Sequence, residues 1–199
     1  PLFLKAHYEQ MEMYRQIKTL FTIHNIEYQG KALKSFRDEV LGVSPCFDVV
    51  IEFDNMVNAM KTGIVMSDII TTVSQTYSYE IRYKYFAYGL ENILNENSYK
   101  LKGITNGIDT KSYNPADDSF LPHLYDSNNL EGKKLCKARL QKDTGLFENP
   151  DVPVVAIVSR LVSHKGLELI EWVADELSNQ NLQLIILGTG DKRYEDLFR

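Results

Sequence analysis

Short apolar runs alternate with amphipathic stretches along this chain, and the alternation predicts strands and helices in turn. Four extended apolar or β-branched runs, at 18–23, 68–74, 154–159 and 183–187, predict buried strands. A weaker fifth run lies at 101–104. Apolar residues at helical spacing predict helices at 1–14, 55–67, 76–84, 90–97, 128–145, 166–178 and after 190. Strand and helix alternation of this kind indicates an α/β fold with parallel sheets and right-handed crossovers.

Polar residues follow directly after the first predicted strand. His24 and Asn25 come at its carboxyl end, and in open parallel sheets ligands bind beyond that end of the strands. The two residues are therefore candidate binding residues. From this position alone, capping of the strand is an equally good explanation for both residues.

A second candidate site follows the strand at 154–159. Arg160 and Lys165 flank a short turn between this strand and a helical pattern, which is the layout of an anion-binding turn. Further on, Gly188 and Gly190 follow the strand at 183–187. A G-x-G pair without a third glycine is only half of a dinucleotide fingerprint, so we interpret it as a tight turn that lets a ligand or backbone approach closely.

Composition narrows the classes of partner. The chain has 199 residues, a net charge of −5 and a hydrophobic content of 44%, which indicates a folded protein whose surface does not favour nucleic acid or anionic membrane. Cys46 and Cys136 lie far apart and have no zinc-like spacing, so we expect neither a metal site nor a disulfide framework. No apolar run is long enough for a membrane span. Because helical patterns are under way at both ends, we expect a piece of a larger protein.

Several motifs occur together in a specific order. They are Thr-Ile-His-Asn-Ile-Glu-Tyr-Gln-Gly at 22–30, Lys-Thr-Gly-Ile-Val-Met-Ser-Asp at 61–68, Thr-Val-Ser-Gln-Thr-Tyr at 72–77, Gly-Ile-Thr-Asn-Gly-Ile-Asp at 103–109, and Ser-Arg-Leu-Val-Ser-His-Lys-Gly at 159–166. Their order and spacing resemble those of bacterial glycogen synthases and plant starch synthases, the glycosyltransferases of family 5. The resemblance extends over nearly the whole chain.

The resemblance implies an α/β fold of the GT-B type, with two Rossmann-like parallel-sheet domains that face each other across a cleft and are both incomplete here. Residues 1–105 would be the C-terminal part of the N-terminal, acceptor-side domain, residues 106–115 the interdomain crossing, and residues 116–199 the first part of the C-terminal, nucleotide-sugar-binding domain. The implied reaction is retaining transfer of glucose from ADP-glucose to the 4-hydroxyl end of an α-1,4-glucan. No cofactor is implied, and this segment alone would be inactive.

The resemblance also assigns roles to individual residues. Arg160 and Lys165 match the cationic pair on the donor diphosphate, and His24 matches the histidine on the donor glucose, so these three are the predicted catalytic residues. The predicted substrate-binding residues are His24, Asn25, Tyr28, Asn106, Arg160, Lys165, Gly188 and Gly190. No carboxylate pair typical of glycosidases is evident in this segment.

Two alternatives remain open from the sequence. One is another sugar-nucleotide transferase of the same fold, such as sucrose-phosphate synthase, and the other is a non-catalytic glucan-binding fragment. The expected partners are a nucleotide-sugar donor and an α-1,4-glucan, with neither nucleic acid nor membrane, and self-association of the fragment through exposed sheet edges. The expected location is the bacterial cytoplasm, or a plastid for a plant protein.

Overall fold

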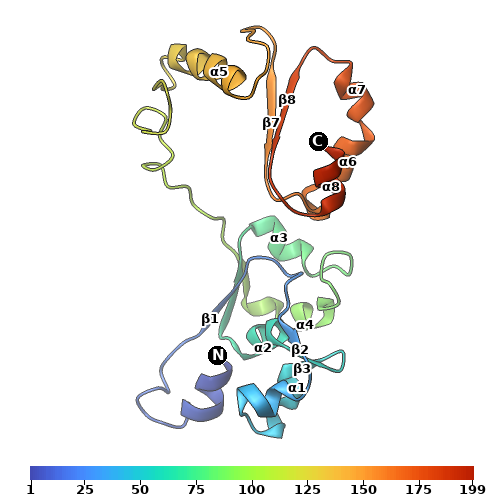
Figure 1. Cartoon of the computed structure of the whole chain (residues 1–199). Helices are drawn as coiled ribbons and strands as arrows, with labels where there is room; N and C mark the ends of the chain where they lie inside the picture. The colour runs from blue at the N-terminus through green and yellow to red at the C-terminus, as the bar shows by residue number, and fades with distance from the viewer. The chain divides into compact units, whose positions relative to one another are not determined.

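The chain divides into two compact units in a computed structural model that describes all residues from 1 to 199 (Figure 1). The first unit is Pro1–Gly107 and the second is Ile108–Arg199. Their boundary falls within the segment 106–115, where the sequence places a domain crossing. Each unit combines a parallel sheet with helices, so the predicted α/β class is confirmed.

The main sheet of the first unit has three parallel strands in the order β1-β5-β6. These are β1 (Leu20–Ile23), β5 (Ile69–Thr72) and β6 (Leu101–Gly103), each within one of the predicted strand segments. Ile23 pairs with Thr72, which pairs in turn with Gly103. The carboxyl ends of all three strands therefore lie at one edge of the sheet.

A small antiparallel sheet in the same unit was not predicted. It contains β2 (Lys31–Ala32), β4 (Met56–Asn58) and β3 (Glu52–Phe53) in that order. Asp54 and Asn55 join β3 to β4 with φ angles of 50° and 62°, and positive φ at both central residues is the signature of a type I′ hairpin turn. The hairpin takes the first residues of the helix predicted at 55–67.

That helix, α2 (Ala59–Met66), begins only after Asn58. The Asn58 side-chain Oδ1 accepts a hydrogen bond from the Lys61 backbone N–H at 2.8 Å, which satisfies one of the unpaired donors of the first turn. Around α2 the core gathers nine buried residues, Ile23, Ile26, Met60, Ile64, Ile70, Ile81, Ala87, Leu90 and Leu94. The helix is thus the centre of the first unit, because it packs against the sheet and the segments that follow it.

The other helices of the first unit are short. They are η1 (Leu4–Tyr8), η2 (Arg37–Leu41), η3 (Pro45–Phe47), α1 (Asp48–Ile51), α3 (Gln75–Glu80), α4 (Glu91–Glu96) and η4 (Ser98–Lys100). Ser74 caps α3, since its Oγ accepts from the Tyr77 N–H at 3.3 Å. The helix predicted at 1–14 is wrong beyond Tyr8, where turns follow; Met11 and Met13 are exposed there, so no apolar face stabilises further helix.

Asp68 ties the starts of β1 and β5 together, which gives the first unit a pH-dependent stability. Its Oδ2 accepts from the Thr19 N–H at 2.7 Å and from the Thr19 hydroxyl at 2.8 Å. These bonds hold the pKa of Asp68 below its ordinary value of 3.8. Because the folded-state pKa is depressed, the contribution is fully present above pH 3.8 and is lost as pH falls through the folded pKa.

We expect Asp68→Asn to lower the free energy of unfolding at neutral pH by about 1 to 2 kcal/mol. The variant should also lose less stability than the wild type as pH falls below 4, roughly the unfolded pKa of aspartate. Urea unfolding between pH 7 and pH 3 measures both effects. Glu39→Gln, which changes an exposed carboxylate, is the control; an equal pH response in Asp68→Asn and in the wild type would contradict this role.

The second unit contains a two-stranded parallel sheet and four α-helices. Its elements are α5 (Glu131–Asp143), β7 (Val154–Val158), η5 (Ser163–Lys165), α6 (Leu167–Trp172), α7 (Ala174–Ser178), β8 (Gln183–Leu187) and α8 (Lys192–Leu197). Strand β8 has the predicted bounds, but the helix predicted at 166–178 is divided at Val173 into α6 and α7. A small core of Leu161, Leu167 and Tyr194 lies beside the carboxyl ends of the two strands.

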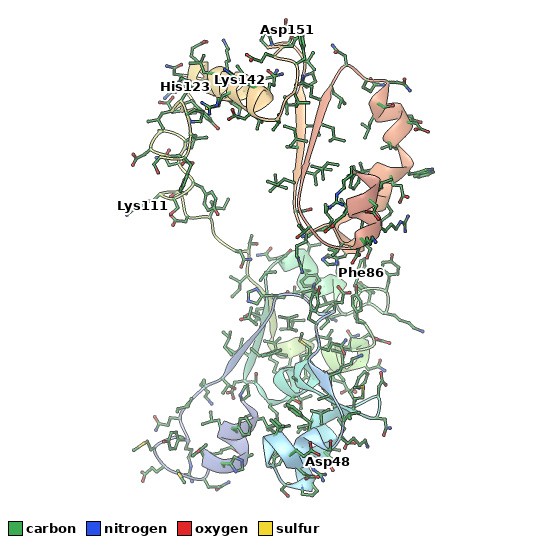
Figure 2. All side chains as sticks on the ribbon, viewed as in Figure 1. Asp48, Phe86, Lys111, His123, Lys142 and Asp151 are labelled. Carbon is green, nitrogen blue, oxygen red and sulfur yellow. The ribbon has the colours of Figure 1, made fainter.

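The segment from 108 to 130 precedes α5 as a chain of turns without strands or helices. Lys111 and His123 lie on this segment and are exposed (Figure 2). Asp109 begins it with a local turn, in which its Oδ1 accepts from the Lys111 and Ser112 N–H groups and its Oδ2 accepts from the Ser112 hydroxyl. These bonds lower the pKa of Asp109. None of the helices has the length and apolarity that crossing a membrane requires.

Candidate functional site

The first group of predicted site residues lies at the carboxyl edge of the β1-β5-β6 sheet. His24 and Asn25 follow β1, and Asn106 follows β6 by three residues. Because Ile23, Thr72 and Gly103 are in register, the parallel sheet brings both segments to the same edge. His24 and Asn106 are both exposed there. The sequence alone could not place them together, since 82 positions separate them.

The loop that carries His24 is held by the residues behind it. Ile26 is buried, and its N–H donates to the Tyr77 hydroxyl at 3.1 Å. Burial raises the pKa of the Tyr77 hydroxyl. Asn25 is a predicted substrate-binding residue, but its Oδ1 accepts a hydrogen bond from the Glu27 N–H at 2.9 Å. The oxygen is thus used in a local turn of the loop. Asn25 therefore shapes the loop that follows β1.

Tyr28 and Gln29 stand next to each other in this loop but have opposite environments. The Tyr28 side chain is 58% exposed, as a residue in contact with a ligand requires, whereas Gln29 is only 4% exposed. The Gln29 amide is hydrogen-bonded to Asn58 and to the backbone of Tyr88. Tyr88 is itself half exposed, so two accessible tyrosines belong to segments that one buried amide connects.

The second group of predicted residues lies in the second unit, at the carboxyl ends of β7 and β8. Strand pairing continues past the strands, since the Ser159 N–H donates to the Leu187 carbonyl at 3.1 Å and the Leu161 N–H donates to the Thr189 carbonyl at 2.9 Å. Arg160 lies between these two bonds, so its backbone is fixed on both sides. Its side chain is exposed.

Lys165 ends η5, the short turn that follows. The Lys165 N–H donates to the Val162 carbonyl at 3.0 Å, and Gly166 adopts φ 73°, a left-handed conformation that ends the turn and starts α6. Arg160 and Lys165 are exposed cations without an ion pair to a carboxylate of this chain, unlike Arg37, Arg139 and Arg193. A guanidinium and an ammonium held five residues apart can bind the oxygens of an anion.

At Gly188 and Gly190 the backbone passes close to the segment 159–161, which is the close backbone approach predicted from the two glycines. A Cβ added at Gly188 would overlap the Ser159 carbonyl oxygen, and one at Gly190 would overlap the backbone of Leu161. The Gly190 N–H donates to Glu195 Oε1 at 2.8 Å. Both glycines therefore support the backbone on either side of Arg160, and the Gly190 amide is already bonded within the protein.

The largest hollows beside α5 in the second unit lie away from the predicted site residues. Two of about 590 and 600 Å³ flank α5, and neither is lined by a predicted site residue. The cations of α5 are partly paired on its surface, Lys134 with Glu131 at 2.6 Å and Arg139 with Asp143 at 2.7 Å. The strand ends are the better candidate site, because Arg160 and Lys165 are exposed there and form no ion pair with a carboxylate of the chain. No cluster of three or more His, Cys, Asp or Glu side chains suited to a metal ion occurs.

Sequence reasoning missed the residues that hold the site segments in place. The loops that carry the predicted binding residues are held by hydrogen bonds from three places: Tyr77, Glu195 and the Gln29–Asn58 pair. Most of these bonds join positions 29 to 59 residues apart, so no local pattern signals them. Glu195 is the exception, because it lies five residues after Gly190 in the helix that begins behind the turn.

Comparison with known proteins identifies relatives of the whole chain. The starch synthase catalytic domain family matches residues 1–96. Glycogen synthases of Clostridium beijerinckii and Clostridium novyi are 42% and 44% identical over 100% and 98% of this chain, and the glycogen synthase of Finegoldia magna is 45% identical over 94% of it. The chain spans about two fifths of the length of these relatives, 40 to 42%.

A solved structure has the same fold. The catalytic domain of starch synthase IV from Arabidopsis thaliana, bound to ADP and acarbose, superposes with a TM-score of 0.87 at 31% sequence identity, over 98% of this chain and 41% of that one. The relatives by sequence and by structure thus agree with each other and with the motifs at 22–30 and 159–166. This chain belongs to the family of bacterial glycogen synthases and plant starch synthases, glycosyltransferase family 5.

Proposed function

We propose that the whole protein is a retaining glucosyltransferase that transfers glucose from ADP-glucose to the 4-hydroxyl end of an α-1,4-glucan. The observation that carries the proposal is the exposed pair Arg160 and Lys165 at the carboxyl ends of β7 and β8 in a chain of the glycogen synthase family. The starch synthase structure with ADP and acarbose supports a nucleotide donor and a glucan-like acceptor for this family.

Arg160 and Lys165 would bind the donor diphosphate. When the bond between glucose and phosphate breaks, negative charge accumulates on the leaving diphosphate, and cations fixed beside it stabilise the transition state more than the ground state. Arg160 suits this role because the hydrogen bonds of Ser159 and Leu161 fix its backbone before any ligand binds. Glu195 holds the Gly190 amide behind the same turn and would act as support.

His24, Asn106 and Tyr28 would contact the sugar. His24 and Asn106 share the exposed edge of the parallel sheet, where a histidine and an amide can hydrogen-bond to sugar hydroxyls. Retention of configuration would follow from departure and attack on the same face of the glucose, with the leaving phosphate taking the acceptor proton. Asn25 would contribute through the shape of the loop, because its oxygen bonds to Glu27.

An incorporation assay of the full-length protein tests the proposal. We expect radiolabelled glucose to pass from ADP-glucose to glycogen, with at least about tenfold lower kcat/KM from UDP-glucose, a difference of roughly 1.4 kcal/mol. Transfer to fructose 6-phosphate in place of glycogen would instead identify a sucrose-phosphate synthase. Binding of maltooligosaccharide without transfer from either donor would identify a glucan-binding protein, and both results would contradict the proposal.

Because its relatives include bacterial glycogen synthases, a cytoplasmic location of the protein is favoured over a plastid. Self-association of the isolated chain stays a prediction of the sequence. Its support is the apolar surface near the strand ends, where Leu20, Ile69, Val158 and Leu187 are between 45% and 73% exposed.

A further inference from the structure

Gln29 is a buried amide within an exposed loop. Its neighbours Tyr28 and Gly30 are exposed, whereas Gln29 itself is 4% exposed. Its Oε1 accepts from Asn58 Nδ2 at 2.8 Å and its Nε2 donates to the Tyr88 carbonyl at 2.9 Å. The side chain therefore connects its own loop to two segments that lie 29 and 59 residues away along the chain.

One side of this connection is held by several hydrogen bonds at the start of α2. Asn58 is fully buried and caps α2 through its Oδ1. The Gln29 carbonyl also accepts from the Met60 N–H at 2.9 Å, and the Gly30 carbonyl accepts from the Ala59 N–H at 3.2 Å. Gln29 is thus fixed to the start of the central helix by its backbone as well as by its side chain.

The other side of the connection is a backbone turn in an unfavourable conformation. Tyr88 has φ 49° and Gly89 has φ 89°, and a non-glycine residue in the left-handed region is retained only where surrounding contacts hold it. The Nε2 bond from Gln29 to the Tyr88 carbonyl is such a contact. Leu90, fully buried, follows directly and anchors the turn to the core.

We infer that Gln29 is a positioning residue, which fixes Tyr28 and Tyr88 relative to each other for binding a sugar substrate. Tyr28 and Tyr88 are 58% and 51% exposed, and Gln29 connects their backbones. A tyrosine offers a sugar both an apolar ring and a hydroxyl, and holding two such side chains in place before binding lowers the entropic cost of binding. The inference rests on the proposed function for the identity of the ligand but not for the contacts of Gln29.

The test compares Gln29→Leu with a matched variant in the full-length protein. Gln141 is the second buried glutamine; it is 1% exposed, and its Nε2 donates to the Asn149 carbonyl at 3.0 Å and to Gln183 Oε1 at 2.7 Å. We expect similar losses in melting temperature from Gln29→Leu and Gln141→Leu. Only Gln29→Leu should lower kcat/KM for glucosyl transfer, by about 30-fold, while Gln141→Leu stays within about threefold of the wild type.

A double-mutant cycle separates positioning from general stability. In the Tyr88→Ala protein the carbonyl that accepts from Gln29 is still present, but the ring is gone. If Gln29 acts by placing that ring, Gln29→Leu should cost less than about threefold in the Tyr88→Ala background. Equal costs in both backgrounds, or a Gln29→Leu protein as active as the Gln141→Leu control, would overturn the inference.

Gln29→Glu resolves which bond matters. A glutamate can still accept from Asn58 but cannot donate to the Tyr88 carbonyl, so we expect it to be as impaired in transfer as Gln29→Leu. Amide hydrogen exchange of residues 88–90 provides a readout that does not depend on the reaction. Faster exchange at residues 88–90 in both Gln29 variants would support the inference, and unchanged exchange would overturn it. If the wild type transfers no glucose, that result refutes the proposed function and leaves the exchange result standing.

Discussion

Loss of the Arg160 guanidinium should lower glucosyl transfer by about a thousandfold in kcat/KM, roughly 4 kcal/mol of transition-state stabilisation. Arg160 is exposed and free of ion pairs, and the Ser159 and Leu161 hydrogen bonds fix its backbone on both sides. A cation held in advance beside the leaving diphosphate stabilises the charge that develops there without reorganising in the reaction. Steady-state kinetics of Arg160→Ala in the full-length protein measures the effect.

Lys165→Ala should show a loss of similar kind, and Arg160→Lys should recover part of the activity, because an ammonium supplies the charge but not the two-pronged geometry of a guanidinium. Arg139→Ala is the matched control. Arg139 is also an exposed arginine of the second unit, but it pairs with Asp143 at 2.7 Å on α5. If Arg160→Ala and Lys165→Ala both keep transfer within about threefold of the wild type, under 1 kcal/mol, the phosphate site is elsewhere.

Gly190→Ala should destabilise the second unit by about 2 to 3 kcal/mol. The three atoms closest to an added Cβ all belong to the backbone of Leu161, which cannot rotate away as a side chain can. The Leu161–Gly190 bridge would have to open, together with the bonds from Leu161 N–H to the Thr189 carbonyl and from Asp191 N–H to the Leu161 carbonyl. Since Leu161 also belongs to the small core with Leu167 and Tyr194, the loss extends beyond the turn.

Denaturant unfolding followed by circular dichroism measures this loss. Gly107→Ala is the control, because nothing lies within 4 Å of a Cβ added there and its φ is not positive. That variant should change the free energy of unfolding by less than about 0.5 kcal/mol. A Gly190→Ala protein as stable as the Gly107→Ala protein would show that the strand ends separate more easily than their hydrogen bonds indicate.

Much of the fold could be predicted because its signals are local. The spacing of apolar residues located all five predicted strands, and the Gly188-Thr189-Gly190 turn was recognised from its glycines. The helix predicted at 55–67 was too long for a physical reason. Asp54 and Asn55 make a type I′ turn, and pairing with β3 draws Met56 and Val57 into a strand despite their helical spacing.

For the candidate site too, local features could be predicted and long-range contacts could not. The sequence itself determined the order of strands and helices and the residues of the motifs, because periodicity, turn residues and motif spacing are properties of neighbouring positions. Only the tertiary structure decided which distant positions come to one place: the segments of His24 and Asn106 share one sheet edge, and Gln29 bonds to Asn58 and Tyr88. The reason is that strand register and buried hydrogen bonds form between segments whose separation along the chain leaves no periodic trace.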